Sequence, residues 1–182
     1  MPLNAFMKSP SAIIGDGDTM ILPDMAATIF EGEAELAVVI GKRASHVKAA
    51  DAMSYVFGYT NFIDGSARGV VPPTNVFYQM KSRDTFAPIG PYIVTADEIK
   101  DPHKLQIRLT NNGFVMQNFK LMTWRIRFRA ALNGSPRFTR CTPAIFSRPA
   151  RTIEGSIRSW TATTSSSPVR AAARCTSQCA MI

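Results

Sequence analysis

The sequence predicts a β-rich α+β domain with short helices, and three features of the chain point to that class. Runs with strand character recur along the first two-thirds, the longest being Glu33–Ile40. Asn111-Asn112-Gly113 lies between two such runs, which is a hairpin signal because Asn and Gly accept positive φ. Helical spacing occurs only in short stretches. With 182 residues, 46% of them hydrophobic, the chain is long enough for one domain with a core.

The first elements are expected to be short strands. Ser11 to Pro23 is predicted to form a strand, a turn at Gly15–Asp18 and a second strand at Met20–Leu22. Glu33–Ile40 follows as a strand that begins by alternating Glu with Ala and ends as a wholly apolar run. Such a run is typical of a strand whose far end is buried on both faces.

The middle of the chain is expected to hold a short helix and another strand. Val47–Tyr55 carries Ala and Met at helical spacing, which favours a short helix. Val56–Ile63 is aromatic and β-branched, so a strand is predicted there that leads to Asp64. Pro72-Pro73 forces a loop after it.

Two further strand regions complete the predicted domain. Phe86–Val94 contains two prolines, so any strand in it lies at a sheet edge or starts late. Lys104–Thr110 and Phe114–Phe119 are predicted to be the two arms of the hairpin.

Charge divides the chain near residue 122. Residues 1–122 hold 11 Lys and Arg against 12 Asp and Glu, whereas residues 123–182 hold ten Arg, no Lys and one acid, Glu154. The formal net charge of +8 therefore comes entirely from the last third. We expect a folded domain over 1–122 and an Arg/Ser/Thr/Ala-rich tail over 123–182. The tail is expected to be largely disordered, because it lacks apolar residues in register.

The composition points to a cytoplasmic protein. No run of 18 apolar residues occurs, so no membrane span is predicted. Met1–Pro10 lacks the charged and then apolar pattern of a signal peptide. The three cysteines, Cys141, Cys175 and Cys179, lack the second ligand pair of a zinc site, so free thiols are expected.

Two acidic side chains share one face of the strand predicted at residues 33–40. Residues two apart in a strand point the same way, with like atoms about 6.5 to 7 Å apart. Glu33 and Glu35 would therefore repel each other without a cation between them, and Mg²⁺, Mn²⁺ or Ca²⁺ prefers such oxygen ligands. Taken alone, the pair also fits a solvated strand face, which Glu31 shares as a bystander. Asp64 alone also fits a turn residue or helix cap, and Lys81 alone fits a solvated lysine.

Four blocks of the chain match one family when they are taken together. They are Phe6-Met7-Lys8-Ser9-Pro10-Ser11, Glu-x-Glu-Leu-Ala-Val-Val-Ile-Gly from residue 33, Gly-Tyr-Thr-x-x-x-Asp-x-Ser-Ala-Arg from residue 58, and Lys-Ser-x-Asp-Thr-Phe-x-Pro-x-Gly-Pro from residue 81. In order and spacing they resemble the fumarylacetoacetate hydrolase family, whose domain opens with F-x-K-x-P-S. The resemblance covers roughly residues 5–122.

The resemblance implies a role for each residue that the family's motifs match. Glu33, Glu35 and Asp64 correspond to the family's three carboxylate ligands of a divalent metal, Mg²⁺ or alternatively Mn²⁺ or Ca²⁺. Lys81 corresponds to the family's lysine near the metal, which helps to hold a substrate oxygen.

Other positions are matched less completely. Arg68 and Asp84 look like partners that orient the ligands, whereas Gly69 stands where many relatives have Asp. The family's His-x-x-Glu pair, in which the His moves a proton, is missing from the sequence. The two histidines of this sequence, His46 and His103, do not match the lid segment in which the family carries that pair, so we assign no general base.

The resemblance also implies a fold and an activity. The fold would be the mixed β-sandwich or roll of the family's catalytic domain, in a homodimer. The activity would be that of a metal-dependent hydrolase or isomerase acting on β-diketo or 2-oxo acids, in which the metal stabilises an enolate. Hydrolysis, isomerisation and decarboxylation stay open, as does a place in the catabolism of aromatic compounds.

The tail departs from the family. The family's D-M-A, P-G-D and T-G-T blocks are missing after Met122. Permissible codons for Met122–Ala130 and Cys141–Gly155 would nevertheless encode these blocks in a shifted reading frame. We hypothesise that residues 123–182 are frameshifted family sequence, which would leave the domain incomplete at its C-terminus. Two alternatives to an enzyme stay open. One is a defective fragment that only binds metal, and the other is nucleic-acid binding through the tail, although the tail shows no recognition motif.

Overall fold

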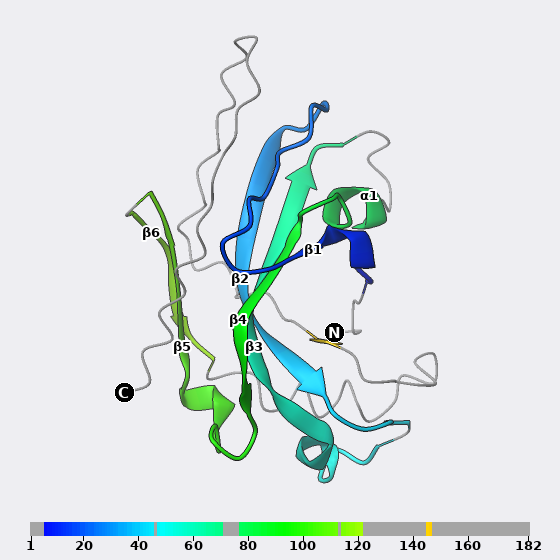
Figure 1. Cartoon of the computed structure of the whole chain (residues 1–182), viewed down its shortest axis with the longest axis vertical. Helices are drawn as coiled ribbons and strands as arrows, with labels where there is room; N and C mark the ends of the chain where they lie inside the picture. Colours follow the sequence, from blue (N-terminus) through cyan, green and yellow to red (C-terminus); the bar gives the residue numbers. More distant parts are fainter. Residues whose placement is uncertain (1–5, 46, 71–76, 113, 122–144, 147–182) are drawn as a thin grey trace.

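The computed structural model describes residues 6–45, 47–70, 77–112, 114–121 and 145–146 (Figure 1). Its strands are β1 (Ile13–Ile14), β2 (Ile29–Ile40), β3 (Val56–Arg68), β4 (Ala87–Thr95), β5 (Gln106–Asn111), β6 (Phe114–Lys120) and β7 (Ile145–Phe146). The one described α-helix is α1 (Phe77–Lys81), and the 3₁₀ turns are η1 (Pro10–Ala12), η2 (Ala52–Tyr55) and η3 (Pro102–Lys104). The β-rich class with short helices is therefore confirmed. No helix in this described part is long and apolar enough to cross a membrane.

The strands form two sheets. Five of them pair in the order β1-β4-β3-β2-β7, and β5 pairs with β6 in a separate hairpin. All pairs are antiparallel except β1 with β4, which are parallel over two residues. The long β2–β3 pair is the centre of the larger sheet, and it carries most of the residues discussed below.

The register of β2 and β3 divides their side chains between two faces. Glu33 lies opposite Asp64, and Ala34 lies opposite Ile63. Directly opposed residues of an antiparallel pair share a face, and successive residues alternate faces. One face of the pair therefore carries Glu33 and Asp64, and the other carries Ala34 and Ile63.

The second of these faces packs into the main core. Eleven buried side chains make up this cluster, among them Leu36, Val38 and Ile40 of β2 and Tyr59 of β3. The β5–β6 hairpin covers them, contributing the buried Ile107. Figure 1 shows this hairpin on one side of the β2–β3 pair and α1 on the other.

The first face is closed by smaller elements. Ala37 and Phe62 lie on it beside the buried Ala12 of η1 and Ala87 of β4. Gly65 of β3 lies close to the residue before β4, because its N–H donates to the carbonyl of Phe86 at 2.9 Å. An added Cβ at Gly65 would lie 2.9 Å from that same oxygen, so only glycine allows this approach.

Several predicted elements are confirmed. The strand at residues 33–40 is the second part of β2, and the hairpin pairs β5 with β6. Asn112 has a φ of 51°, the positive value expected at this turn. The strand within Phe86–Val94 is β4, whose outer edge is paired only at Ala87 and Pro88, so the prolines stand near an edge as predicted.

Three predictions need correction. Met20–Leu22 forms no strand, although the buried Met20 packs in a small core cluster. The helix predicted over Val47–Tyr55 is reduced to the 3₁₀ turn η2. Asp64 does not follow its strand but lies inside β3, which continues to Arg68 because β2 pairs with it throughout.

Other predictions fall outside the described residues. These are the loop at Pro72-Pro73, His46, the three cysteines, and the tail over 123–182 apart from β7, which pairs with β2.

Candidate metal centre

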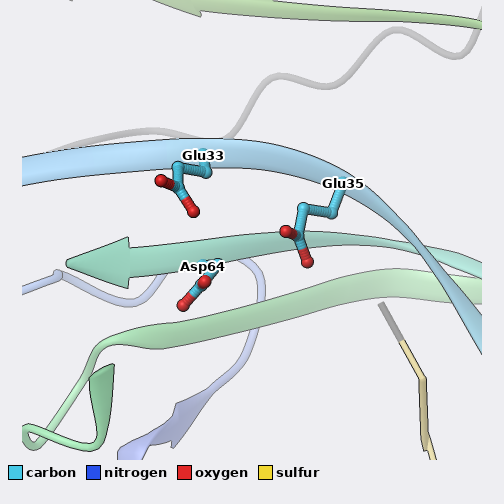
Figure 2. A group of neighbouring side chains, drawn as sticks. All are labelled: Glu33, Glu35 and Asp64. Atoms are coloured by element: carbon cyan, nitrogen blue, oxygen red, sulfur yellow. The ribbon is translucent and has the colours of Figure 1, made fainter. Parts of the chain in front are cut away.

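Three carboxylates converge where β2 and β3 pair. Glu33 lies opposite Asp64, and Glu35 points to the same face two residues along β2. Each of the three offers an oxygen that lies within 4.8 Å of the other two. Figure 2 shows the two glutamates reaching from β2 toward the aspartate on β3. The structure thus brings together the three residues that the sequence singled out.

The spacing of these oxygens fits one hard cation. Ligands lie about 2.1 Å from Mg²⁺, so two of them are about 3 Å apart when adjacent and about 4.2 Å apart when opposite. Around Ca²⁺ the opposite pair reaches about 5 Å. The limit of 4.8 Å falls at the upper end of this range, so small side-chain movements would bring all three onto one ion. A set made only of carboxylate oxygens suits Mg²⁺, Mn²⁺ or Ca²⁺ better than zinc.

Two of the three carboxylates are withdrawn from water, whereas the side chain of Glu33 is 20% exposed. Glu35 and Asp64 are each 2% exposed. A buried carboxylate costs free energy unless cations or hydrogen bonds compensate it. The solvated strand face that Glu33 and Glu35 could have formed is therefore excluded for Glu35, and the cluster needs positive charge beside it.

Lys81 supplies one such charge. It ends α1, is 3% exposed, and donates from Nζ to Asp64 Oδ2 at 2.6 Å and Glu33 Oε2 at 2.8 Å. It also donates to Ser66 Oγ at 2.6 Å, and the ring of Phe6 lies 5.5 Å from Nζ. Lys81 is therefore not the solvated lysine that its segment alone suggests.

Arg68 holds the outer end of the cluster. Its Nη2 donates to Glu33 Oε1 at 2.5 Å and its Nε donates to Glu31 Oε2 at 2.7 Å. Burial disfavours the charged guanidinium, but the hydrogen bond with Glu31 and the charges of both glutamates outweigh this, so the pKa of Arg68 is raised. Arg68 thus lies where a partner orienting Glu33 was predicted, and Glu31 is no bystander, because it anchors Arg68.

Lys8 is a site neighbour that the sequence alone did not single out. Its Nζ donates to Asp64 Oδ1 at 2.5 Å, and also to the backbone carbonyls of Gly65 and Lys81. Burial lowers the pKa of Lys8, and the charge of Asp64 only partly offsets this effect. The available signal was the Phe6-x-Lys8-x-Pro10-Ser11 block, which matches the family at a lysine.

Asp84 was predicted to orient the ligands, but it forms no ion pair with any of them. It is exposed in the turn after α1, and its carboxylate forms no hydrogen bond or ion pair with another described residue. The one histidine in the described ranges, His103, lies in η3 and contacts the carbonyl of Leu121 beside the β5–β6 hairpin. The hairpin covers the other face of the β2–β3 pair, so His103 is not placed beside the three carboxylates.

Gly69 has a structural reason to be glycine. Its φ is +72°, and an added Cβ would lie 1.5 Å from Thr28 Oγ1. An Asp at this position would therefore need a different arrangement of Thr28.

The charges of the described cluster nearly balance. Its three cationic side chains are those of Lys8, Arg68 and Lys81, and its four carboxylates are those of Glu31, Glu33, Glu35 and Asp64. With every group ionised, four negative and three positive charges leave −1. One divalent cation would change this to +1, which favours an anionic ligand.

A buried cluster of carboxylates and lysines on one sheet face is typical of an enzyme active site. The family comparison defines that class further. The chain belongs to the Fumarylacetoacetate (FAA) hydrolase C-terminal family, which matches residues 1–132. The family predicted from the four blocks is therefore confirmed, and its members include enzymes.

Curated relatives carry a more specific name. The chain is 41% identical over 152 residues to "Oxaloacetate tautomerase FAHD2A, mitochondrial" of Bos taurus, a match that covers 77% of this chain and 48% of that protein. It is 38% identical over 152 residues to the protein of the same name in Homo sapiens, with the same coverage. The chain thus spans about half the length of the curated relatives it matches.

Solved structures share the fold. One is maleylpyruvate hydrolase from Sphingobium sp. SYK-6 in complex with manganese (II) ion and pyruvate, with a TM-score of 0.68 and 29% identity over 80% of this chain and 55% of that one. Another is 5-carboxymethyl-2-hydroxymuconate delta-isomerase from Mycobacterium smegmatis, with a TM-score of 0.67 and 30% identity over 80% and 59%.

Proposed function

We propose that this chain is the catalytic part of a divalent-metal-dependent hydrolase or isomerase that acts on β-diketo or 2-oxo acids. Glu33, Glu35 and Asp64 would hold the cation, Mg²⁺ or Mn²⁺ or alternatively Ca²⁺. The observation that carries the proposal is the convergence of their three oxygens within 4.8 Å on one sheet face, where Glu35 and Asp64 are buried. The similar maleylpyruvate hydrolase, solved in complex with manganese (II) ion and pyruvate, supports the ion and substrate class.

Once bound, the cation would supply a Lewis acid that stabilises enolate charge on neighbouring substrate oxygens. The residues of the chain supply the rest. Lys81 Nζ gives its three N–H donors to Glu33, Asp64 and Ser66, and a cation held by the carboxylates would free a donor that can bind a substrate oxygen and favour negative charge on it. The exclusion of water around Lys81, which is 3% exposed, strengthens this interaction.

The class of reaction is supported by the relatives. The curated relatives are named tautomerases, and solved neighbours are named hydrolases and isomerases. Keto–enol isomerisation of oxaloacetate is therefore the first reaction to assay, followed by cleavage of acylpyruvates. Decarboxylation and a place in the catabolism of aromatic compounds stay predictions.

A second function is a chain that binds the cation without turnover. One observation favours it: within the part of the chain that the structure describes, no histidine is placed beside the carboxylates. A saturating Mn²⁺ signal with no turnover of oxaloacetate or acylpyruvates would support this second function over the first.

The decisive experiment measures Mn²⁺ binding by the full chain, by titration calorimetry or by electron paramagnetic resonance of free Mn²⁺. We expect binding at one site, with Glu35→Gln and Asp64→Asn each weakening the affinity about 100-fold or more. Loss of a residue that only orients a metal ligand lowers metal affinity about 10- to 100-fold. Loss of a ligand itself should lower the affinity by at least the upper value.

The matched control is Glu98→Gln, which removes an exposed carboxylate at the end of β4. Its affinity should equal that of the wild type. If the wild type binds no Mn²⁺, or if Glu35→Gln and Glu98→Gln behave alike, the proposed metal site is wrong.

Three further predictions concern the setting of the enzyme. A homodimer remains our proposal for its assembly. The cytoplasmic location stays a prediction, because vertebrate relatives are named as mitochondrial proteins. Nucleic-acid binding would depend on residues 123–182, which lie outside the described residues except for β7.

A further inference from the structure

The segment before η1 is held firmly against α1. The ring of Phe6 stacks on that of Phe77, with centroids 5.4 Å apart and planes 6° apart. The N–H of Ser9 donates to Ser82 Oγ at 3.1 Å, and that hydroxyl donates to the carbonyl of Met7 at 3.2 Å. The backbone is therefore held in place on both sides of Lys8.

The ammonium of Lys8 joins the two elements that carry the cluster. An ammonium has three N–H donors, and Lys8 Nζ has three acceptors: Asp64 Oδ1 and the carbonyls of Gly65 and Lys81. The first two acceptors belong to β3 and the third to the end of α1. The side chain is only 11% exposed, so water has little access to the pair with Asp64.

The two oxygens of Asp64 consequently have different surroundings. Oδ1 accepts from Lys8 at 2.5 Å, and Oδ2 accepts from Lys81 at 2.6 Å. Lys81 also donates to Glu33, so Oδ2 is the oxygen that shares a lysine with another carboxylate of the cluster. Lys8 forms an ion pair with Asp64, and its charge also acts on the neighbouring Glu35.

We propose that Lys8 is a positioning residue of the metal centre. Its hydrogen bond occupies Asp64 Oδ1, so that Asp64 offers one oxygen to the cation. Its positive charge also limits the affinity of the site for the cation. A carboxylate that binds through one oxygen occupies one coordination position where a two-oxygen carboxylate occupies two. Lys8 thereby conserves a position for substrate. The inference rests on the proposed function, because it requires a cation at Glu33, Glu35 and Asp64.

The test compares Lys8→Met with Lys8→Arg in the full chain, with Mn²⁺ alone as the probe. Lys8→Met should bind Mn²⁺ about tenfold more tightly than the wild type, because a like charge beside the ion is removed and Oδ1 is released. Lys8→Arg keeps the charge and should stay within about threefold of the wild type. A purely structural lysine would give unchanged or weaker binding in Lys8→Met, and either result overturns the proposal.

A second variant tests the proposal if Lys8→Met does not fold. Lys8→Gln keeps an N–H donor for Asp64 without the charge, and it should show the same gain in affinity if Lys8→Met does not fold. If neither variant folds with Mn²⁺ present while Lys8→Arg does, Lys8 serves the fold and the proposal is overturned. A wild type that binds no Mn²⁺ would instead defeat the proposed function itself.

Discussion

The two faces of the β2–β3 pair are built from alternate residues of the same strands, yet they are held in opposite ways. One face carries Leu36 and Val38, which are 3% and 0% exposed and pack under the β5–β6 hairpin. The other carries Glu35 and Asp64, each 2% exposed and lying beside lysines. Burial is nearly the same on both faces, so burial alone does not tell a core from a site.

The two faces differ in whether the burial of their side chains favours or opposes folding. Burial of Leu36 stabilises the fold by removing apolar surface from water. Burial of Asp64 opposes folding, and it is tolerated because Lys8 and Lys81 lie within hydrogen-bonding distance of its two oxygens. The apolar face thus stabilises the scaffold, whereas the charged face depends on it.

The largest expected effect is on the apolar face. Leu36→Ala should lower the free energy of unfolding by about 3.5 kcal/mol, because it leaves a cavity under the hairpin. Urea unfolding measures this, and the deficit should be the same with and without Mn²⁺. Ile21→Ala, at a residue 58% exposed, is the control and should change stability by less than about 0.5 kcal/mol. A Mn²⁺-dependent deficit in Leu36→Ala would mean that the two faces are coupled.

The next effect is on the charged face. Lys81→Met should lower the free energy of unfolding by about 3 kcal/mol in the absence of metal, because Glu33 and Asp64 lose the ammonium group that pairs with both of them. Mn²⁺ should reduce this deficit, since it replaces the missing positive charge. Lys100→Met, at an exposed lysine, is the matched control. A deficit that Mn²⁺ leaves unchanged would show that Lys81 acts on stability like a core residue.

The smallest effect is expected at Asp84. Because its carboxylate is exposed and forms no hydrogen bond or ion pair with a described residue, Asp84→Asn should change stability by less than about 0.5 kcal/mol. Its Mn²⁺ affinity should remain within about threefold of the wild type. A tenfold loss of affinity would instead support the role that the family resemblance implies for Asp84.

Local patterns predicted the parts of this arrangement that depend on a strand's period of two. Glu33 and Glu35 had to share a face once a strand was assigned, and the Asn111-Asn112-Gly113 turn indicated the hairpin. The same patterns misplaced the end of β3, because Val56–Ile63 continues through less apolar residues that only the pairing with β2 keeps extended. They also overestimated the helix near Ala52, where Ala and Met spacing yields one 3₁₀ turn.

The sequence by itself determined the family, the three acidic residues and the face that two of them share. Only the tertiary structure decided which cations accompany them. Lys8 and Lys81 lie 56 and 17 residues from Asp64, and no periodicity links residues at such separations. Their burial depends on how the segment before η1 and α1 pack across β3, and that packing is a property of the whole fold.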